Sequence, residues 1–192
     1  MSTRIAVRIV FWIWFIAALF IGRQLVLQRL PPAAIPAFVF GLSALLVDLY
    51  FRIPPLRAWV DALDLRAIVL LHVTRFVGIY FLVLYHRGEL PHDFAVNGGI
   101  GDIVVATFAL PVALAPLDDG TRRRALVIWN VAGLIDILFV AATAARLNFA
   151  DPAQTHALTH LPLSLLPTFL VPLIIASHVV IFARVARLQS AA

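Results

Sequence analysis

The sequence contains neither lysine nor cysteine, and these two absences exclude several kinds of chemistry. Without lysine, no Schiff base can form with retinal or pyridoxal phosphate, and a phosphate-binding loop ending in GK[ST] is excluded as well. Without cysteine, the chain cannot form disulfides, hold an iron–sulfur cluster or attach a c-type haem covalently. Histidine, aspartate and a single glutamate remain as strong metal ligands.

Charged residues are also scarce. Only 13% of the 192 residues are charged, 62% are hydrophobic, and the mean hydropathy is +0.99. A soluble globule of this size needs more polar surface, so the composition predicts a membrane protein. The net charge of +5 comes from arginines that stand mainly at the ends of apolar runs, where they meet lipid headgroups. The predicted partner is therefore the lipid bilayer, and no nucleic acid is expected to bind.

Mostly apolar stretches separated by short polar loops predict membrane-spanning segments. Each is long enough to cross about 30 Å of hydrocarbon at about 1.5 Å per residue. Because lipid cannot hydrogen-bond an exposed backbone, each span should be a helix. The predicted fold class is all-α, a six-transmembrane-helix bundle forming a single membrane domain over residues 1–192. The predicted spans are 5–26, 33–52, 66–86, 100–117, 124–146 and 161–186.

The distribution of arginine predicts the orientation of these spans, since arginine is retained on the cytoplasmic side during insertion. One side carries Arg4, Arg8, Arg52, Arg57, Arg66, Arg122, Arg123, Arg124, Arg184 and Arg187, whereas the other carries Arg23, Arg29, Arg87 and Arg146. Both termini are therefore predicted to be cytoplasmic. The loops around residues 86–99 and 147–160 are predicted to face the other compartment.

Several helix ends can be predicted from local residue patterns. Thr121 is placed to cap the fifth span, and Asp151 followed by Pro152 predicts the start of a short interfacial helix over about 152–160. The last span carries three prolines, and each removes an amide and crowds the carbonyl four residues earlier. We therefore expect a bent helix whose freed carbonyls find partners on neighbouring helices or in water. These prolines are Pro162, Pro167 and Pro172.

Two opposite charges lie inside predicted spans. Arg75 stands in the third span and Asp136 in the fifth, at depths that differ by only a few ångströms. An isolated charge at mid-bilayer costs about 3 kcal/mol on insertion scales, and a partner at the same depth offsets much of this. We expect an ion pair that faces the bundle interior, either as a functional site or as a device that fixes helix register.

Other polar residues are predicted to join this pair in a pocket. His72, Arg75 and His86 fall on one face of the third span if it is a regular α-helix. The predicted pocket lies in the cytoplasmic half and contains Asp48, His72, Arg75, Asn130, Asp136 and His178. Asp102 closes the glycine-rich segment 97–102 and is also counted among the pocket residues. It is predicted to be either the N-cap of the fourth span or part of a turn that approaches a ligand.

The histidines suggest two metal-binding alternatives. His72 and His178 lie at similar predicted depths on different helices, which is the arrangement that the two axial ligands of a b-type haem require. On the opposite side of the membrane, His86, His92, His156 and His160 are candidate ligands for zinc or copper. The alternative interpretation is that the buried pair packs or relays protons, and that the outer four lie among lipid headgroups.

A set of short motifs resembles a family of uncharacterised bacterial inner-membrane proteins with several spans. The resemblance covers about residues 66–180, and the histidines other than His178 match no part of it. It implies a bacterial inner-membrane bundle with recurring polar positions at Arg75, Asp102, Asn130, Asp136 and His178. The motifs are Leu71 to Gly78, Gly101-Asp102, Trp129-Asn130, Gly133 to Asp136, and Pro167 to Pro172 with His178.

These observations favour a non-enzymatic membrane protein, with no catalytic residue assigned. Its polar pocket would bind or pass a small molecule or a proton, or the chain would be a subunit of a larger membrane complex or a homo-oligomer. A histidine-ligated haem or copper redox protein is the first alternative. A membrane enzyme that uses Asp136 or Asp102 as a general base is the second, and it requires a water-accessible cleft.

Overall fold

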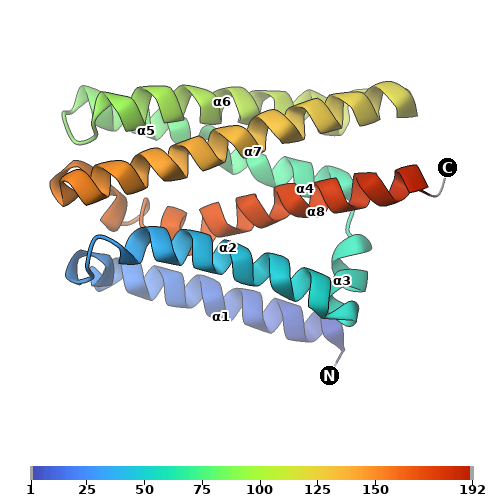
Figure 1. Cartoon of the computed structure of the whole chain (residues 1–192), viewed down its shortest axis with the longest axis horizontal. Coiled ribbons are helices and arrows are strands. Elements are labelled where there is room, and N and C mark those ends of the chain that lie inside the picture. The colour runs from blue at the N-terminus through green and yellow to red at the C-terminus, as the bar shows by residue number, and fades with distance from the viewer. Residues whose placement is uncertain (1, 191–192) are drawn as a thin grey trace. The chain divides into compact units, whose positions relative to one another are not determined.

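The computed structural model describes residues 2–190, and side chains within residues 2–187. All regular elements in this range are helical, and η denotes a 3₁₀ or π helix. In Figure 1 the colour of the ribbon follows the chain from blue at the N-terminus to red at the C-terminus. They are α1 (Thr3–Arg23), η1 (Val26–Arg29), α2 (Ala34–Arg52), α3 (Pro54–Asp61), α4 (Leu65–Leu70), η2 (Leu71–Phe76), α5 (Val77–His86), α6 (His92–Leu114), α7 (Asp119–Ala150), η3 (Pro152–Thr159), η4 (Leu166–Leu170) and α8 (Val171–Ser190).

Within the described residues, six helices are long and apolar enough to cross a membrane. They are α1, α2, the helical run Leu65–His86, α6, α7 and the run Leu166–Arg187. The predicted all-α class and the predicted number of apolar helices are therefore confirmed. The short amphipathic helix α3 was not predicted, because its eight residues lie in what the hydropathy pattern marks as a loop.

The start of α7 differs from the prediction, because Asp118 rather than Thr121 caps it. The carboxylate Oδ1 of Asp118 accepts a hydrogen bond of 3.0 Å from the backbone N–H of Thr121. This bond lowers the pKa of the exposed Asp118 carboxyl. The predicted cap at Asp151 is confirmed, since its carboxylate accepts a hydrogen bond from the backbone N–H of Ala153. The helix that follows Asp151 is a 3₁₀ helix.

The fourth apolar helix begins well before the predicted residue 100, at His92. Gly88, with φ +72°, ends the preceding helix, and Pro91 stands at the N-cap position of α6. The glycine-rich segment 97–102 is consequently helical, and its glycines serve packing. A Cβ on Gly78 would overlap the carbonyl oxygen of Gly99, so the backbones of α5 and α6 meet where neither residue has a side chain.

The third apolar helix is not a regular α-helix, since the 3₁₀ segment η2 interrupts it. A 3₁₀ helix has three residues per turn, so residues three apart point in the same direction. His72 and Arg75 are three apart, and both are fully buried. His86, predicted to share their face, is exposed instead. That part of the prediction is wrong, because His86 is the last residue of α5 and lies at the exposed end of the helix.

The chain divides into two compact units, each described here by itself. Unit 1 contains the residues up to Ala62 together with Ala144–Ala176. Unit 2 contains Leu63–Thr143 and the residues from Ser177 onward. In unit 2, α6 packs along α4, η2 and α5. The single membrane domain over residues 1–192 stays a prediction.

In unit 1, a tryptophan replaces a backbone donor that a proline removes. Pro172 lacks the N–H that would bond to the carbonyl of Thr168 in a regular helix. The indole Nε1 of Trp14 donates to this carbonyl at 2.9 Å. The ring of Phe169, in the π turn η4, packs against Trp14 with a centroid distance of 4.6 Å. A freed carbonyl therefore finds its partner on another helix, as the sequence predicts.

This contact yields a test of stability. We expect Trp14→Phe to lower the free energy of unfolding by about 1 kcal/mol, because it leaves the Thr168 carbonyl without its indole donor. Unfolding of the purified protein in detergent, followed by circular dichroism, measures this change. Trp12→Phe is the matched control, since the Trp12 side chain is exposed. Equal stability of the two variants would contradict the role of Trp14.

Candidate functional site

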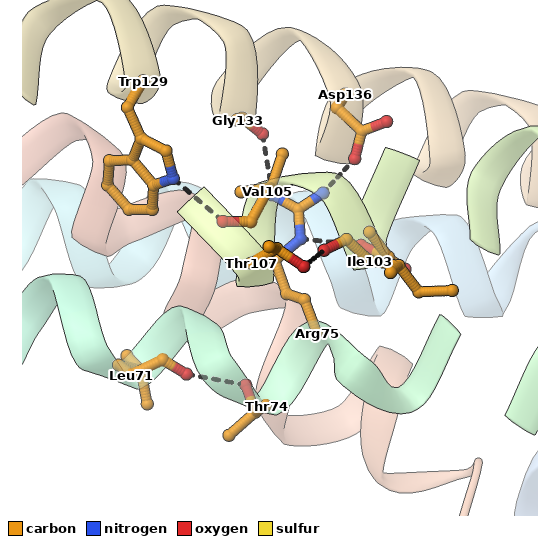
Figure 2. A network of polar contacts seen from close by, with 10 residues as sticks. Leu71, Thr74, Arg75, Ile103, Val105, Thr107, Trp129, Gly133 and Asp136 are labelled. Atoms are coloured by element: carbon orange, nitrogen blue, oxygen red, sulfur yellow. Dashed lines mark hydrogen bonds and ion pairs between the residues drawn. The ribbon is translucent and has the colours of Figure 1, made fainter. Parts of the chain in front are cut away.

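Arg75 is the centre of a buried polar network in unit 2, shown in Figure 2. Its Nε donates to Oδ1 of Asp102 at 2.6 Å, and its Nη1 donates to the carbonyl of Gly133 at 3.0 Å. Its Nη2 donates to Oδ2 of Asp136. One guanidinium from η2 thus joins α6 and α7 through three different acceptors. The predicted ion pair between Arg75 and Asp136 is present, and a second carboxylate completes it.

The three charged side chains differ in burial. The side chain of Arg75 is 1% exposed, that of Asp102 is 4% exposed, and that of Asp136 is 19% exposed. Two carboxylates share one guanidinium, so the cluster carries an excess negative charge if both are ionised. Asp136 is the member that reaches the surface of the unit.

Asp102 occupies the interior of α6, so the N-cap interpretation is wrong. The helix begins at His92, and Asp102 therefore lies within it, where its carboxylate meets Arg75 rather than free backbone amides. The interpretation of a turn at residues 97–102 is wrong for the same reason. An aspartate inside an apolar helix is the signal that could have identified Asp102 as a second partner of Arg75.

Two glycines create the space that the network fills. A Cβ on Gly101 would overlap Oδ1 of Asp136, so no larger residue fits at 101 while Asp136 keeps this position. A Cβ on Gly133 would lie 2.7 Å from Cε1 of His178, which is closer than real Cβ contacts. The carbonyl of Gly133 also accepts from Arg75. Gly133 therefore contacts both the charged cluster and the neighbouring histidine.

A second group of polar side chains lies beside the first. His72 Nε2 is 3.0 Å from Ser177 Oγ, and the rings of His72 and His178 pack with centroids 4.3 Å apart. The ring of Trp129 packs against His72 at 4.9 Å, and its Nε1 donates to the carbonyl of Val105. Ser177 and Trp129 were not predicted as site residues, because neither type stands out in an apolar helix.

Asn130 fixes the orientation of His178. Its Nδ2 donates to the backbone carbonyl of His178 at 3.1 Å, so its Oδ1 is left to accept from Nδ1 of the imidazole at 2.7 Å. This network assigns the proton to Nδ1 and leaves a lone pair on Nε2. Within the described chain, His178 Nε2 and His72 Nδ1 are buried without a hydrogen-bond partner.

The histidine pair does not fit a haem. Axial ligation places the two imidazoles on opposite faces of a porphyrin with the iron between them. Here the two rings are in direct contact with each other, and Trp129 packs against His72. No space for a macrocycle remains between them. The similar depths of His72 and His178 in the sequence correctly predicted that they lie together. Their rings, however, pack directly against each other.

Asp48 is the one predicted pocket residue that lies in unit 1. It lies on α2 in unit 1, where its carboxylate pairs with Arg52 at 2.6 Å, and its side chain is 48% exposed. Depth along the membrane normal was the basis for grouping Asp48 with Arg75. Depth alone does not specify which helices are neighbours, so the place of Asp48 in the pocket stays a prediction.

The outer histidines form two separate pairs. In unit 2, the rings of His86 and His92 both contact Tyr85. In unit 1, the rings of His156 and His160 lie 4.5 Å apart, and His160 Nε2 is 2.9 Å from Gln28 Nε2. Among the side chains that the structure describes, no group of three or more histidine, aspartate or glutamate residues is arranged to hold a metal ion. The outer zinc or copper site stays a prediction.

Removing the guanidinium tests the cluster. We expect Arg75→Met to lower the free energy of unfolding by about 3–5 kcal/mol, since it leaves buried carboxylates without their counter-charge. Unfolding of the detergent-solubilised protein measures the change, and failure to accumulate folded protein would be the extreme of the same effect.

Arg52→Met is the matched control for this variant. It breaks the exposed pair with Asp48, in which the Arg52 side chain is 78% exposed. A loss below about 1 kcal/mol is expected, because solvent screens such pairs. If Arg75→Met is as stable as Arg52→Met, Arg75 does not hold the unit together.

Comparisons with known proteins complete the description of the site. No curated protein and no solved structure matches the chain. A family model described as a domain of unknown function matches residues 31–186, which include every residue of the Arg75 network. The expectation of an uncharacterised family is thereby confirmed, and the chain belongs to the DUF8737 family.

Proposed function

We propose that the chain is a multi-pass protein of the bacterial inner membrane, with both termini on the cytoplasmic side. The six long apolar helices support this proposal, as does the resemblance described above. Large apolar side chains such as Val10, Ile128 and Ile135 are 65%, 71% and 64% exposed. A surface of this kind is unfavourable in water and is the normal lipid-facing surface of a membrane helix.

The absence of native cysteine permits a direct test of this orientation. Single variants Ala153→Cys, Ser2→Cys and Gly120→Cys each carry one thiol at an exposed position. A membrane-impermeant maleimide applied to spheroplasts should label Ala153→Cys. It should label the other two only after lysis, because their positions are predicted to be cytoplasmic. The reverse pattern would contradict the orientation, and recovery of the protein without membranes would contradict the location.

We propose further that the Arg75 cluster binds a proton reversibly inside this membrane protein. The observation that carries the proposal is the sharing of one buried guanidinium by Asp102 and Asp136. With both carboxylates ionised, the cluster has an excess negative charge in surroundings of low dielectric constant, where an unbalanced charge costs several kcal/mol. A proton on one carboxyl balances the cluster while Arg75 keeps a carboxylate partner.

Asp136 is the member suited to exchange this proton. Its side chain is 19% exposed, whereas that of Asp102 is 4% exposed. Oδ1 of Asp102 instead accepts from Nε of Arg75 at 2.6 Å and holds the guanidinium in place. The enzymatic alternative requires a water-accessible cleft beside the aspartate that acts as general base, and it stays a prediction.

Infrared spectroscopy tests for the proton directly. A protonated carboxyl has a C=O stretching band distinct from the bands of a carboxylate. We expect the purified protein to show such a band near neutral pH, and the band should disappear as the pH is raised. Asp136→Asn should remove it, because the amide cannot carry the exchangeable proton.

Asp119→Asn is the control, because Asp119 is an exposed aspartate at the start of the same helix, α7. This variant should keep the band. A wild-type spectrum in which every carboxyl is ionised near neutral pH would show that the cluster holds no proton. A band that survives in Asp136→Asn but is lost in Asp102→Asn would assign the proton to Asp102 instead.

A further inference from the structure

Gly101 and Asp102 are consecutive residues of α6, and they meet the Arg75 cluster in opposite ways. Asp102 supplies a side chain, whose Oδ1 accepts from Nε of Arg75 at 2.6 Å. Gly101 supplies none, and the carboxylate of Asp136 fills the space that a side chain would take. A Cβ on residue 101 would overlap Oδ1 of Asp136 and would lie 2.8 Å from its Cγ and 3.3 Å from its Oδ2. The whole carboxylate therefore packs against the backbone of α6 at this residue.

This position of the carboxylate is also the one from which Asp136 reaches Arg75. Its Oδ2 accepts from Nη2, and Figure 2 shows the other oxygen pointing away from the guanidinium. A methyl group at residue 101 would be too close to Cγ as well as to Oδ1, so rotation of the carboxylate could not relieve the overlap. Asp136 would have to move away from α6, while Asp102 would keep its bond to Nε. The ion pair of Asp136 thus depends on the absence of a side chain at residue 101.

We propose that Gly101 is a positioning residue that sets how strongly the cluster holds its proton. This inference rests on the proposed function and names the residue that tunes it. Burial favours the protonated form of a carboxyl group, whereas an opposite charge in contact favours the ionised form. The place of the Asp136 carboxylate decides the balance between these two effects. By letting the carboxylate reach Arg75, Gly101 allows the proton to leave at a lower pH than it would leave an unpaired carboxyl in the same surroundings.

A second glycine of α6 separates this role from helix packing in general. Gly98 lies one turn before Gly101, and a Cβ there would lie 3.1 Å from Cγ2 of Val140 in α7. Substitution of Gly98 therefore disturbs the same pair of helices through an aliphatic side chain, without touching the carboxylate. The other charged or titratable groups of the network are Arg75 and His72 from η2, Asp102 from α6 and His178 from α8.

The pH dependence of the infrared band tests the inference on the full-length protein. In Gly101→Ala, the band of the protonated carboxyl should persist to a pH at least about one unit higher than in the wild type, which corresponds to about tenfold tighter proton binding. The reason is that the displaced carboxylate loses its contact with Arg75. Gly98→Ala should keep the wild-type midpoint, even if it lowers stability. Gly41→Ala is the control in α2, where an added Cβ would meet no atom within 4 Å.

A stability measurement locates the effect of the added methyl group at the carboxylate. Gly101→Ala alone should lower the stability of the protein in detergent, because its methyl group would overlap Asp136. In the Asp136→Ala background this overlap is gone, so the same substitution should cost little, and the two changes should not be additive. If Gly101→Ala does not accumulate as folded protein, recovery of folded Gly101→Ala/Asp136→Ala would assign the failure to the same overlap.

Three results would contradict the inference. A midpoint in Gly101→Ala that is unchanged, or that moves to lower pH, would overturn it and leave the proposed proton site intact. An equal upward shift in Gly98→Ala would do the same, since loosened packing of α6 against α7 would then account for the change. A wild-type spectrum without a protonated carboxyl would instead overturn the proposed function, and the inference with it.

Discussion

A guanidinium buried among apolar helices must find hydrogen-bond acceptors inside the protein, and this requirement organises unit 2. Arg75 satisfies it with two carboxylates and one backbone carbonyl, which come from α6 and α7. Each acceptor restricts the position of its helix relative to η2. Leaving the guanidinium unpaired would cost more than any single apolar contact contributes, so alternative packings of these helices are strongly disfavoured.

Close approach of the helices is what allows a single side chain to reach all three acceptors. Gly78 and Gly99 let the backbones of α5 and α6 meet, and Gly101 leaves room for the Asp136 carboxylate. Small residues at helix contacts are a general feature of membrane proteins, because lipid supplies little hydrophobic force to press helices together. In this unit they have a second effect, since the space left at Gly101 is filled by Oδ1 of Asp136.

Hydropathy and depth predicted much of this arrangement from the sequence. The six apolar helices follow from the length of the apolar runs, and the pairing of Arg75 with Asp136 follows from their similar depth. His86 was misplaced because it is the last residue of α5, where the helix ends and the side chain is exposed. Asp102 was misplaced because an acidic residue after glycines resembles a helix start, whereas the start is fixed by Pro91 and His92. Helix adjacency depends on packing that depth does not encode.

The histidine pair gains a physical role from its contact with the charged cluster. Gly133 presents its carbonyl to Arg75 and its Cα to the ring of His178, so α8 and the guanidinium meet at one residue of α7. Asn130, one turn away on the same helix, accepts from the imidazole Nδ1 through its Oδ1 and donates to the backbone carbonyl of His178 through its Nδ2. If Asp136 exchanges a proton as proposed, loss of that proton would strengthen the attraction between Arg75 and α7, and Gly133 is the residue of α7 that lies against both Arg75 and His178. A change of charge on α7 would then reach α8 through packing, without a titration of the histidine itself.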